Sequence, residues 1–342
     1  MKKRYIPVIS SMAFACLIVI LSGCSFGLQP LPSTVQQQLN DAVDRGMDGI
    51  IVCVNRPDDI QLYAAGWKNR EEQIPADPHA LFKIASISKL YIAAATTRLV
   101  AEEKLSLDKT LAEYIPEVAD RIEFADRITL KMMLQHRSGI LDYSSEPEVT
   151  GETFDDYLSF AARIYDKPAV FEPNKKYRYS NTNYLLIGEI LDRTLGYSHH
   201  TYVRDELLTP LGLSNTYNIS AEANMEELMS GYLKGWEPDV KDWEYPLPGG
   251  SMIATAEDVS IFLRALIDGT LLSPEEQAIY TSVYPYEHTG WLPGYTSIAR
   301  YHPDIDAVVV QFVNTSGKEI YWLELKRLYK RIVRILEMNY QS

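Results

Sequence analysis

Two pairs of apolar segments, one near each end of the chain, carry the strand-like pattern of this sequence. Residues 49–54 and 60–65 are largely apolar, and the segment between them contains Asn, Pro and Asp. Residues 295–301 and 307–313 repeat this arrangement late in the chain, again around a segment with Pro and Asp. Short apolar runs separated by turn residues are typical of strands joined as hairpins. We therefore expect one hairpin from each end of the chain.

Helical periodicity dominates the remaining sequence. Apolar residues recur at helical spacing in the segments 35–45, 183–195, 255–267 and 320–338. The pattern between residues 106 and 245 is mostly helical, with little strand signal. This order predicts an α/β (α+β) fold, in which an antiparallel sheet built from both chain ends is flanked by helices and an all-helical domain is inserted. The expected boundaries are 34–105 and 245–342 for the sheet domain and 106–244 for the helical domain.

The first 23 residues are expected to be a lipoprotein signal peptide and not part of the fold. Three basic residues, 2–4, precede an apolar stretch at 7–21 that is short for a membrane span. Small residues lead up to Cys24, which resembles the lipid-modified first residue of mature bacterial lipoproteins. Residues 24–33 would then form a tether, and the lipid would hold the protein to a membrane of the cell envelope on the extracytoplasmic side. The alternative is an uncleaved membrane anchor that happens to end in cysteine.

Charge and cysteine content narrow the classes of partner. The formal net charge is −13 and becomes about −16 without the three basic residues at the N-terminus, which argues against a nucleic-acid partner. Cys53 is the one cysteine beyond the signal and the lipidation position, and its apolar neighbours indicate a buried core residue. No Cys/His spacing indicates a structural zinc site.

Ser86 and Lys89 form a Ser-x-x-Lys pair at the start of a predicted helix. Residues three apart lie on one helix face, with Cβ atoms roughly 5–6 Å apart, so the amine can reach the hydroxyl. Serine becomes a strong nucleophile only when a base removes its proton, and a helix N-terminus favours the resulting negative charge. The same spacing occurs at Ser106 and Lys109, where it is typical of a helix cap. The pair therefore needs further partners before it indicates an active site.

Tyr179 and Asn181 supply the second element of a candidate site. A tyrosine beside a lysine can have a lowered pKa and accept a proton. The side chain of Asn181 both donates and accepts, so it could hold Lys89 and a substrate amide together. The alternative is a turn in which the Ser-Asn pair caps the following helix.

His288, Thr289 and Gly290 supply the third element, immediately before the late hairpin, where they could line a strand edge. Gly290 would allow the backbone to approach a ligand closely. The backbone N–H groups of Trp291 and Ser86 could together form an oxyanion hole. The alternative is a Gly- and Pro-rich loop with a surface histidine.

In order and spacing, the three elements resemble the serine penicillin-recognising enzymes. This superfamily contains the class C β-lactamases, the DD-peptidases, and related esterases and D-aminopeptidases. The resemblance covers nearly the whole mature chain, and it rests on the segments 82–89, 134–140, 179–184, 249–258 and 288–294.

The resemblance implies a β-lactamase/transpeptidase-like fold and an acyl-enzyme mechanism that needs no metal or organic cofactor. Ser86 would be the nucleophile, while Lys89 and Tyr179 would share the proton transfers, with the choice of base left open. Asn181 would orient the substrate amide, and residues 288–291 would complete the substrate-binding site. The expected partners are small-molecule or peptide substrates such as peptidoglycan-like peptides and β-lactams.

One position departs from the class C β-lactamases, which carry lysine where this chain has His288. A histidine near neutral pH is charged only part of the time, which disfavours efficient β-lactam hydrolysis. The leading hypothesis is therefore a D-Ala-D-Ala carboxypeptidase-like enzyme of the cell envelope. A class C-like β-lactamase and a small-ester esterase or amidase are the alternatives. A non-catalytic binding lipoprotein is the alternative of another class, and the intact Ser86, Lys89, Tyr179 and Asn181 argue against it.

Overall fold

The computed structural model describes residues 30–145 and 156–340. The expected signal peptide, Cys24 and most of the tether lie outside the described residues, so lipidation stays a prediction. Within the described ranges, no helix combines the length and the apolar character that a membrane span requires.

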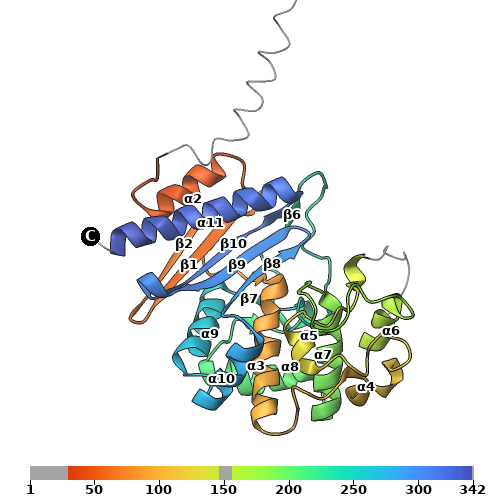
Figure 1. The fold of residues 1–342 in the computed structure, drawn as a ribbon. Helices are drawn as coiled ribbons and strands as arrows, with labels where there is room; N and C mark the ends of the chain where they lie inside the picture. Colours follow the sequence, from red (N-terminus) through yellow and green to blue (C-terminus); the bar gives the residue numbers. More distant parts are fainter. Residues whose placement is uncertain (1–29, 146–155, 341–342) are drawn as a thin grey trace, which may run out of the picture.

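Six antiparallel strands form the central sheet, in the order β3-β2-β1-β10-β9-β8 (Figure 1). The two predicted hairpins join in its middle, where β1 pairs with β10 and Cys53 lies opposite Val310. A sheet built from both chain ends and flanked by helices confirms the predicted fold class. The strands are β1 (Gly49–Arg56), β2 (Asp59–Asn69), β3 (Ile74–Pro75), β8 (Glu287–Leu292), β9 (Tyr295–His302) and β10 (Ala307–Val313).

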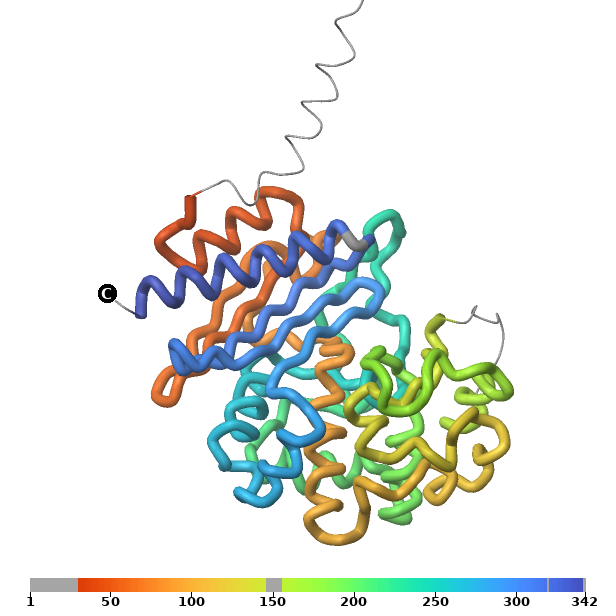
Figure 2. Tube along the Cα trace, in the orientation of Figure 1, coloured from red at the N-terminus to blue at the C-terminus, as the bar shows by residue number. Residues whose placement is uncertain are grey.

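Both faces of the sheet are buried, which explains why β1 is a continuous apolar run. Ile50 and Val52 pack in the cluster beneath α2 and α11. Ile51 and Cys53 point to the opposite face and belong to the larger core, which includes residues of α3 and α9. Figure 2 shows α2 and α11, from the two ends of the chain, side by side on one face of the sheet. These helices are α2 (Val35–Val43), α3 (Ser88–Ala101), α9 (Ala256–Asp268) and α11 (Glu319–Tyr340).

A layer of helices lies against the other face of the sheet (Figure 1). Thr255 caps α9, because its Oγ1 accepts a hydrogen bond from Asp258 N at 3.1 Å. The remaining helices are α4 (Leu111–Tyr114), α5 (Leu130–Leu134), α6 (Tyr157–Ala161), α7 (Asn181–Leu195), α8 (His199–Tyr202), which a π-helical turn (Val203–Leu208) continues, and α10 (Pro274–Val283).

Short strands between the layers were not predicted. β5 (Thr216–Tyr217) and β6 (Tyr232–Leu233) fall within the segment expected to be all-helical, which corrects that expectation. At two residues each, they are too short to produce a periodic signal. The partners are β4 (Phe82–Lys83) and β7 (Ile253–Ala254) in a sheet of order β4-β7-β5, and β11 (Thr315–Ser316) beside β6. The domain boundaries given above stay predictions.

Candidate active site

Ser86 is the one incompletely buried residue between Ala80 and Thr97. It lies in a single 3-10 turn (Ala85–Ile87) that leads directly into α3, so the predicted helix begins just after it and not at it. Ala85 has a left-handed φ of 53°, a conformation that costs free energy for an alanine. This sharp turn between β4 and α3 leaves Ser86 partly accessible while the neighbouring side chains stay in the core.

Lys89 lies in the first turn of α3, and its amine is enclosed by acceptors. Its Nζ is 3.1 Å from Ser86 Oγ, 3.0 Å from Asn181 Oδ1 and 2.7 Å from the carbonyl oxygen of Gly249. Burial lowers the pKa of Lys89 to about 7, although the carboxylate of Asp142 opposes that shift. The amine can therefore be neutral close to physiological pH, as a base for Ser86 must be.

Tyr179 approaches Ser86 from the segment that precedes α7, and its hydroxyl donates to Ser86 Oγ at 2.8 Å. Burial raises the pKa of Tyr179 above its ordinary value. The sequence-based hypothesis of a lowered tyrosine pKa is therefore wrong, because desolvation outweighs the hydrogen bond to Ser86. His136 stabilises this segment: its ring centroid is 4.4 Å from that of Tyr179, and its Nδ1 accepts from Ser180 N at 3.2 Å.

Asp142 is a member of the site that the sequence did not identify. Its Oδ2 is 3.2 Å from Asn181 Nδ2, so the carboxylate accepts from the amide group of Asn181. This contact fixes the orientation of Asn181 and leaves its Oδ1 to face Lys89. No motif distinguishes Asp142 in the sequence from the many other acidic residues on turns.

The segment from His288 to Trp291 forms most of β8, the edge strand nearest Ser86. β8 pairs with β9 on one side, and its other side lies against the turn that carries Ser86. A Cβ on Gly290 would lie 2.4 Å from the carbonyl oxygen of Ile84, so only glycine permits this approach. The side chain of Trp291 is half exposed. The oxyanion hole from the Ser86 and Trp291 amides stays a prediction.

His288 is neutral in this environment. Its ring stacks on Tyr284 at an interplanar angle of 6°, and its Nδ1 donates to the carbonyl oxygen of Thr289 at 2.5 Å. Burial, with a further contribution from Lys89, lowers the pKa of His288 to about 3. The expectation of partial charge near neutral pH is therefore wrong, since burial penalises the imidazolium form. The cleft has no fixed positive charge at this position.

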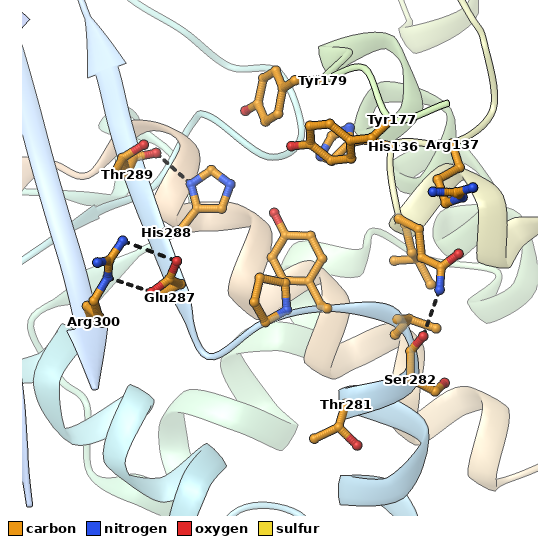
Figure 3. A pocket seen from close by; sticks show the side chains of 15 residues that line it. His136, Arg137, Tyr177, Tyr179, Thr281, Ser282, Glu287, His288, Thr289 and Arg300 are labelled. Carbon is orange, nitrogen blue, oxygen red and sulfur yellow. Dashed lines mark hydrogen bonds and ion pairs between the residues drawn. The ribbon is translucent and has the colours of Figure 1, made fainter. Parts of the chain in front are cut away.

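A cavity of about 590 Å³ lies between α5, the end of α10 and β8, and its wall includes Tyr179, the hydrogen-bond partner of Ser86 (Figure 3). Tyr179, His288 and Thr289 line it on the side of Ser86, and Arg137 contributes a guanidinium to its wall. The other charged residues of the wall, Glu287 and Arg300, pair with each other. The cavity wall therefore contains one uncompensated positive charge, Arg137, together with the hydrogen-bond partner of Ser86, Tyr179.

The remaining sequence candidates lie away from this cluster. Ser106 and Lys109 are exposed in the turn before α4. Cys53 is buried, and burial raises the pKa of its thiol to about 12, which leaves it unreactive near neutral pH. In residues 30–145 and 156–340, no group of three His, Cys, Asp or Glu side chains could hold a metal ion.

Comparison with known proteins identifies the family of this chain. The chain matches the beta-lactamase family model over residues 33–284, and it therefore belongs to the beta-lactamase family. Its relatives include penicillin-binding proteins and a D-amino acid amidase.

Among curated relatives, penicillin-binding protein 4 of Amycolatopsis lactamdurans is 29% identical over 61% of this chain and 57% of its own length. Protein flp of Staphylococcus aureus (strain MW2) is 27% identical over 58% of this chain and 41% of its own length. The matches thus span about half the length of these relatives.

Among solved structures, D-amino acid amidase from Ochrobactrum anthropi SV3 complexed with L-phenylalanine is similar to this chain, with a TM-score of 0.79 and 25% identity. The match covers 90% of this chain and 98% of that chain. A penicillin binding protein from Bacillus halodurans has a TM-score of 0.72 at 21% identity, over 88% of this chain and 98% of that one, and shares the fold.

Proposed function

We propose that this protein is a D-peptidase of the cell envelope that cleaves the C-terminal residue from peptides of the D-Ala-D-Ala type. Arg137 is the observation that carries this proposal over the amidase and esterase alternatives. A carboxypeptidase substrate retains a carboxylate next to its scissile bond, whereas a primary amide or a simple ester carries none there. The relatedness to penicillin-binding proteins and D-amino acid amidases supports the same substrate class.

Arg137 is prepared to bind an anion. Its Nε donates to Asn174 Oδ1 at 2.7 Å and its Nη2 donates to the carbonyl oxygen of Asn174 at 2.8 Å, so the guanidinium is held in place. It forms no ion pair with any residue that the structure describes. Guanidinium recognises carboxylates through paired hydrogen bonds, and a preorganised side chain loses little entropy on binding.

In the proposed mechanism, Lys89 is the base. Its pKa of about 7 leaves much of the amine neutral, while the raised pKa of Tyr179 keeps the phenol protonated. Lys89 accepts the Ser86 proton as Oγ attacks the substrate carbonyl carbon, and the amides of Ser86 and Trp291 stabilise the oxyanion. The C–N bond then breaks, and the proton passes to the departing amine through Lys89 and Tyr179. Water attacks the acyl-enzyme, releases the shortened peptide and restores the Ser86 hydroxyl.

The test is intact-mass spectrometry after brief exposure to a penicillin, with Ser86→Ala alongside, followed by assays on a D-Ala-D-Ala peptide. We expect a persistent adduct that the variant lacks, and release of D-alanine. Penicillin consumption without a lasting adduct would instead identify a β-lactamase. Cleavage of esters or D-amino acid amides, with D-Ala peptides left intact, would favour those alternatives. No acylation by any of these substrates would revive the non-catalytic hypothesis.

Substitution of Arg137 should change substrate preference more than overall activity. The measurement compares kcat/KM for a peptide with a free C-terminal carboxylate with kcat/KM for the same peptide as its carboxamide. We expect Arg137→Gln to lower this ratio by about 10-fold or more, because a charge-assisted hydrogen bond to the carboxylate is lost. Arg127→Gln is the matched control, since Arg127 is exposed and pairs with Glu172. An unchanged ratio in Arg137→Gln would show that the guanidinium does not bind the substrate.

The pH dependence of the reaction should report Lys89. If the neutral amine is the base, kcat/KM rises with pH through about 7. The carboxylate of Asp142 raises the pKa of Lys89, so Asp142→Asn, which can still accept from Asn181, should move this midpoint to lower pH by about half a unit or more. Asp126→Asn, at an exposed position, should leave it in place. A midpoint that moves upward in Asp142→Asn would contradict Lys89 as the base.

We further propose that the protein is lipid-anchored through Cys24 on the extracytoplasmic side of a membrane. The basic, apolar and small-residue segments that precede Cys24 support this localisation. Mass spectrometry of the mature N-terminus would test it, because a diacylated Cys24 is expected there.

A further inference from the structure

We propose that the exposed face of α11 rests on an anionic lipid surface and holds the helical layer on the far side of the sheet from the membrane. The face consists of Lys326, Arg327, Lys330 and Arg334, which are exposed along one side of this C-terminal helix. It is here called the basic strip. The basic strip would act together with the lipid proposed on Cys24, whichever substrate the enzyme cleaves.

The basic strip gathers four cations on one helix of a chain whose formal net charge is −13. None of its four side chains forms an ion pair with the residues that the structure describes. Lys326 contacts the ring of Trp322, with Nζ 5.1 Å from its centroid. Most other exposed arginines are paired, as Arg121 is with Asp166 and Arg204 is with Asp205. Four cations left unpaired on one helix face point to an external anionic partner.

Apolar side chains accompany the basic strip at both ends of the helix. Ile320 and Leu323 are 62% and 48% exposed at its start, and Met338 and Tyr340 are 57% and 56% exposed at its end. A free helical surface in water would be expected to carry polar residues at these positions. Basic residues flanked by exposed apolar ones are typical of helices that lie in the interfacial region of a bilayer.

The start of the described chain lies directly beside this helix. Arg331, on the flank of the basic strip, donates from Nη2 to the carbonyl oxygen of Pro30 at 2.9 Å, and α11 packs against α2. Cys24 precedes Pro30 by six residues, a length that reaches at most ~20 Å when extended. A lipid on Cys24 would therefore keep the α2 and α11 side of the molecule near the bilayer.

The energetics suit an orienting role. Each basic side chain near an anionic surface contributes only modestly to binding, so the basic strip alone would bind weakly and reversibly. Added to a lipid anchor, the same contribution is enough to select one orientation. In that orientation the sheet lies between the membrane and the helical layer (Figure 1).

The experiment uses the full chain mixed with vesicles of phosphatidylcholine alone or of phosphatidylcholine with phosphatidylglycerol. After flotation, an amine-acylating reagent is added, and the modification of each lysine is followed by peptide mass spectrometry. On the anionic vesicles we expect Lys326 and Lys330 to react at least about threefold more slowly than on the neutral ones. Lys175 and Lys176, exposed on the helical layer, should react equally on both. Salt at 1 M, where the Debye length is ~3 Å, should remove the protection.

A charge-reversal variant keeps both reporter lysines. Arg327→Glu combined with Arg334→Glu should abolish the protection of Lys326 and Lys330, whereas Arg127→Glu combined with Arg204→Glu should not. Three results would overturn the proposal: equal reactivity on both vesicles, protection on neutral lipid that salt does not remove, and a chain that floats with neither vesicle. Protection without vesicles that grows with protein concentration would instead identify a second copy of this chain as the partner.

Discussion

Lys89→Met should greatly slow acylation of Ser86 while leaving the fold intact. The variant retains the length and the apolar stem of the lysine but lacks the atom that lies 3.1 Å from Ser86 Oγ. A positioned general base contributes about 10²–10⁴-fold to a rate, so we expect adduct formation with penicillin to slow by that factor. Lys175→Met, at an exposed lysine, should acylate at the wild-type rate.

The same variant should reveal the cost of burying this amine. The pKa of Lys89 is about 7 in the folded protein, whereas an unperturbed lysine has a pKa of 10.5, so between these values the unfolded chain binds more protons than the folded one. Wild-type stability therefore rises with pH across this window relative to a variant without the amine. From pH 7 to pH 9 the free energy of unfolding of the wild type should increase by about 2 kcal/mol relative to that of Lys89→Met.

Denaturant unfolding of both proteins at the two pH values measures this difference. Comparing the two pH values removes most of the effect of the lost hydrogen bonds to Asn181 and Gly249, which is similar at each pH. A stability difference that does not change with pH would show that Lys89 is protonated throughout and is not the base. In that case the proton acceptor would have to be sought elsewhere around Ser86.

The sequence predicted the fold and the outline of the site because their signals are local or periodic. The continuous apolar run of β1 arises because both faces of that strand are buried. The helical periodicity of α9 arises because one face of that helix is buried along its length. The Ser86 and Lys89 pair is likewise local, since one turn separates its members. Tyr179 and His288 come from segments roughly 90 and 200 positions away, and only the resemblance to a family connected them with Ser86.

What the sequence did not reveal depends on irregular structure. The carbonyl oxygen of Gly249 accepts from Lys89, but a backbone acceptor leaves no side-chain signal. Asp142 and Arg137 lie in the segment that follows α5, where the conformation has no period. His288 is neutral because it is buried, in part under the stacked ring of Tyr284. The sequence motif around His288 does not reveal this burial. The hydrogen bond to the Gly249 carbonyl, the positions of Asp142 and Arg137 and the charge of His288 all depend on the surrounding structure and not on residue type.

Gly290→Ala should disable the enzyme through a single added methyl group. Its Cβ would lie 2.1 Å from Ser297 Oγ and 2.4 Å from the carbonyl oxygen of Ile84, far inside van der Waals contact. One neighbour belongs to β9 and the other to the turn before Ser86, so β8 cannot move away from both at once. We expect the free energy of unfolding to fall by about 2–3 kcal/mol, and acylation to slow at least ~100-fold because Ser86 is displaced. Gly250→Ala is the control, since its nearest added contact would be 3.9 Å away.

A second substitution separates the structural from the catalytic effect. Ser297→Ala removes the closer of the two clashes, at the cost of the hydrogen bond from Ser297 Oγ to the Ile84 carbonyl oxygen at 2.9 Å. In the double variant, stability should recover in part, because β8 then has space on the β9 side. Acylation should stay slow, since the contact with Ile84 still displaces the turn that carries Ser86. If acylation recovered together with stability, the approach of β8 to Ile84 would not be what holds the nucleophile in place.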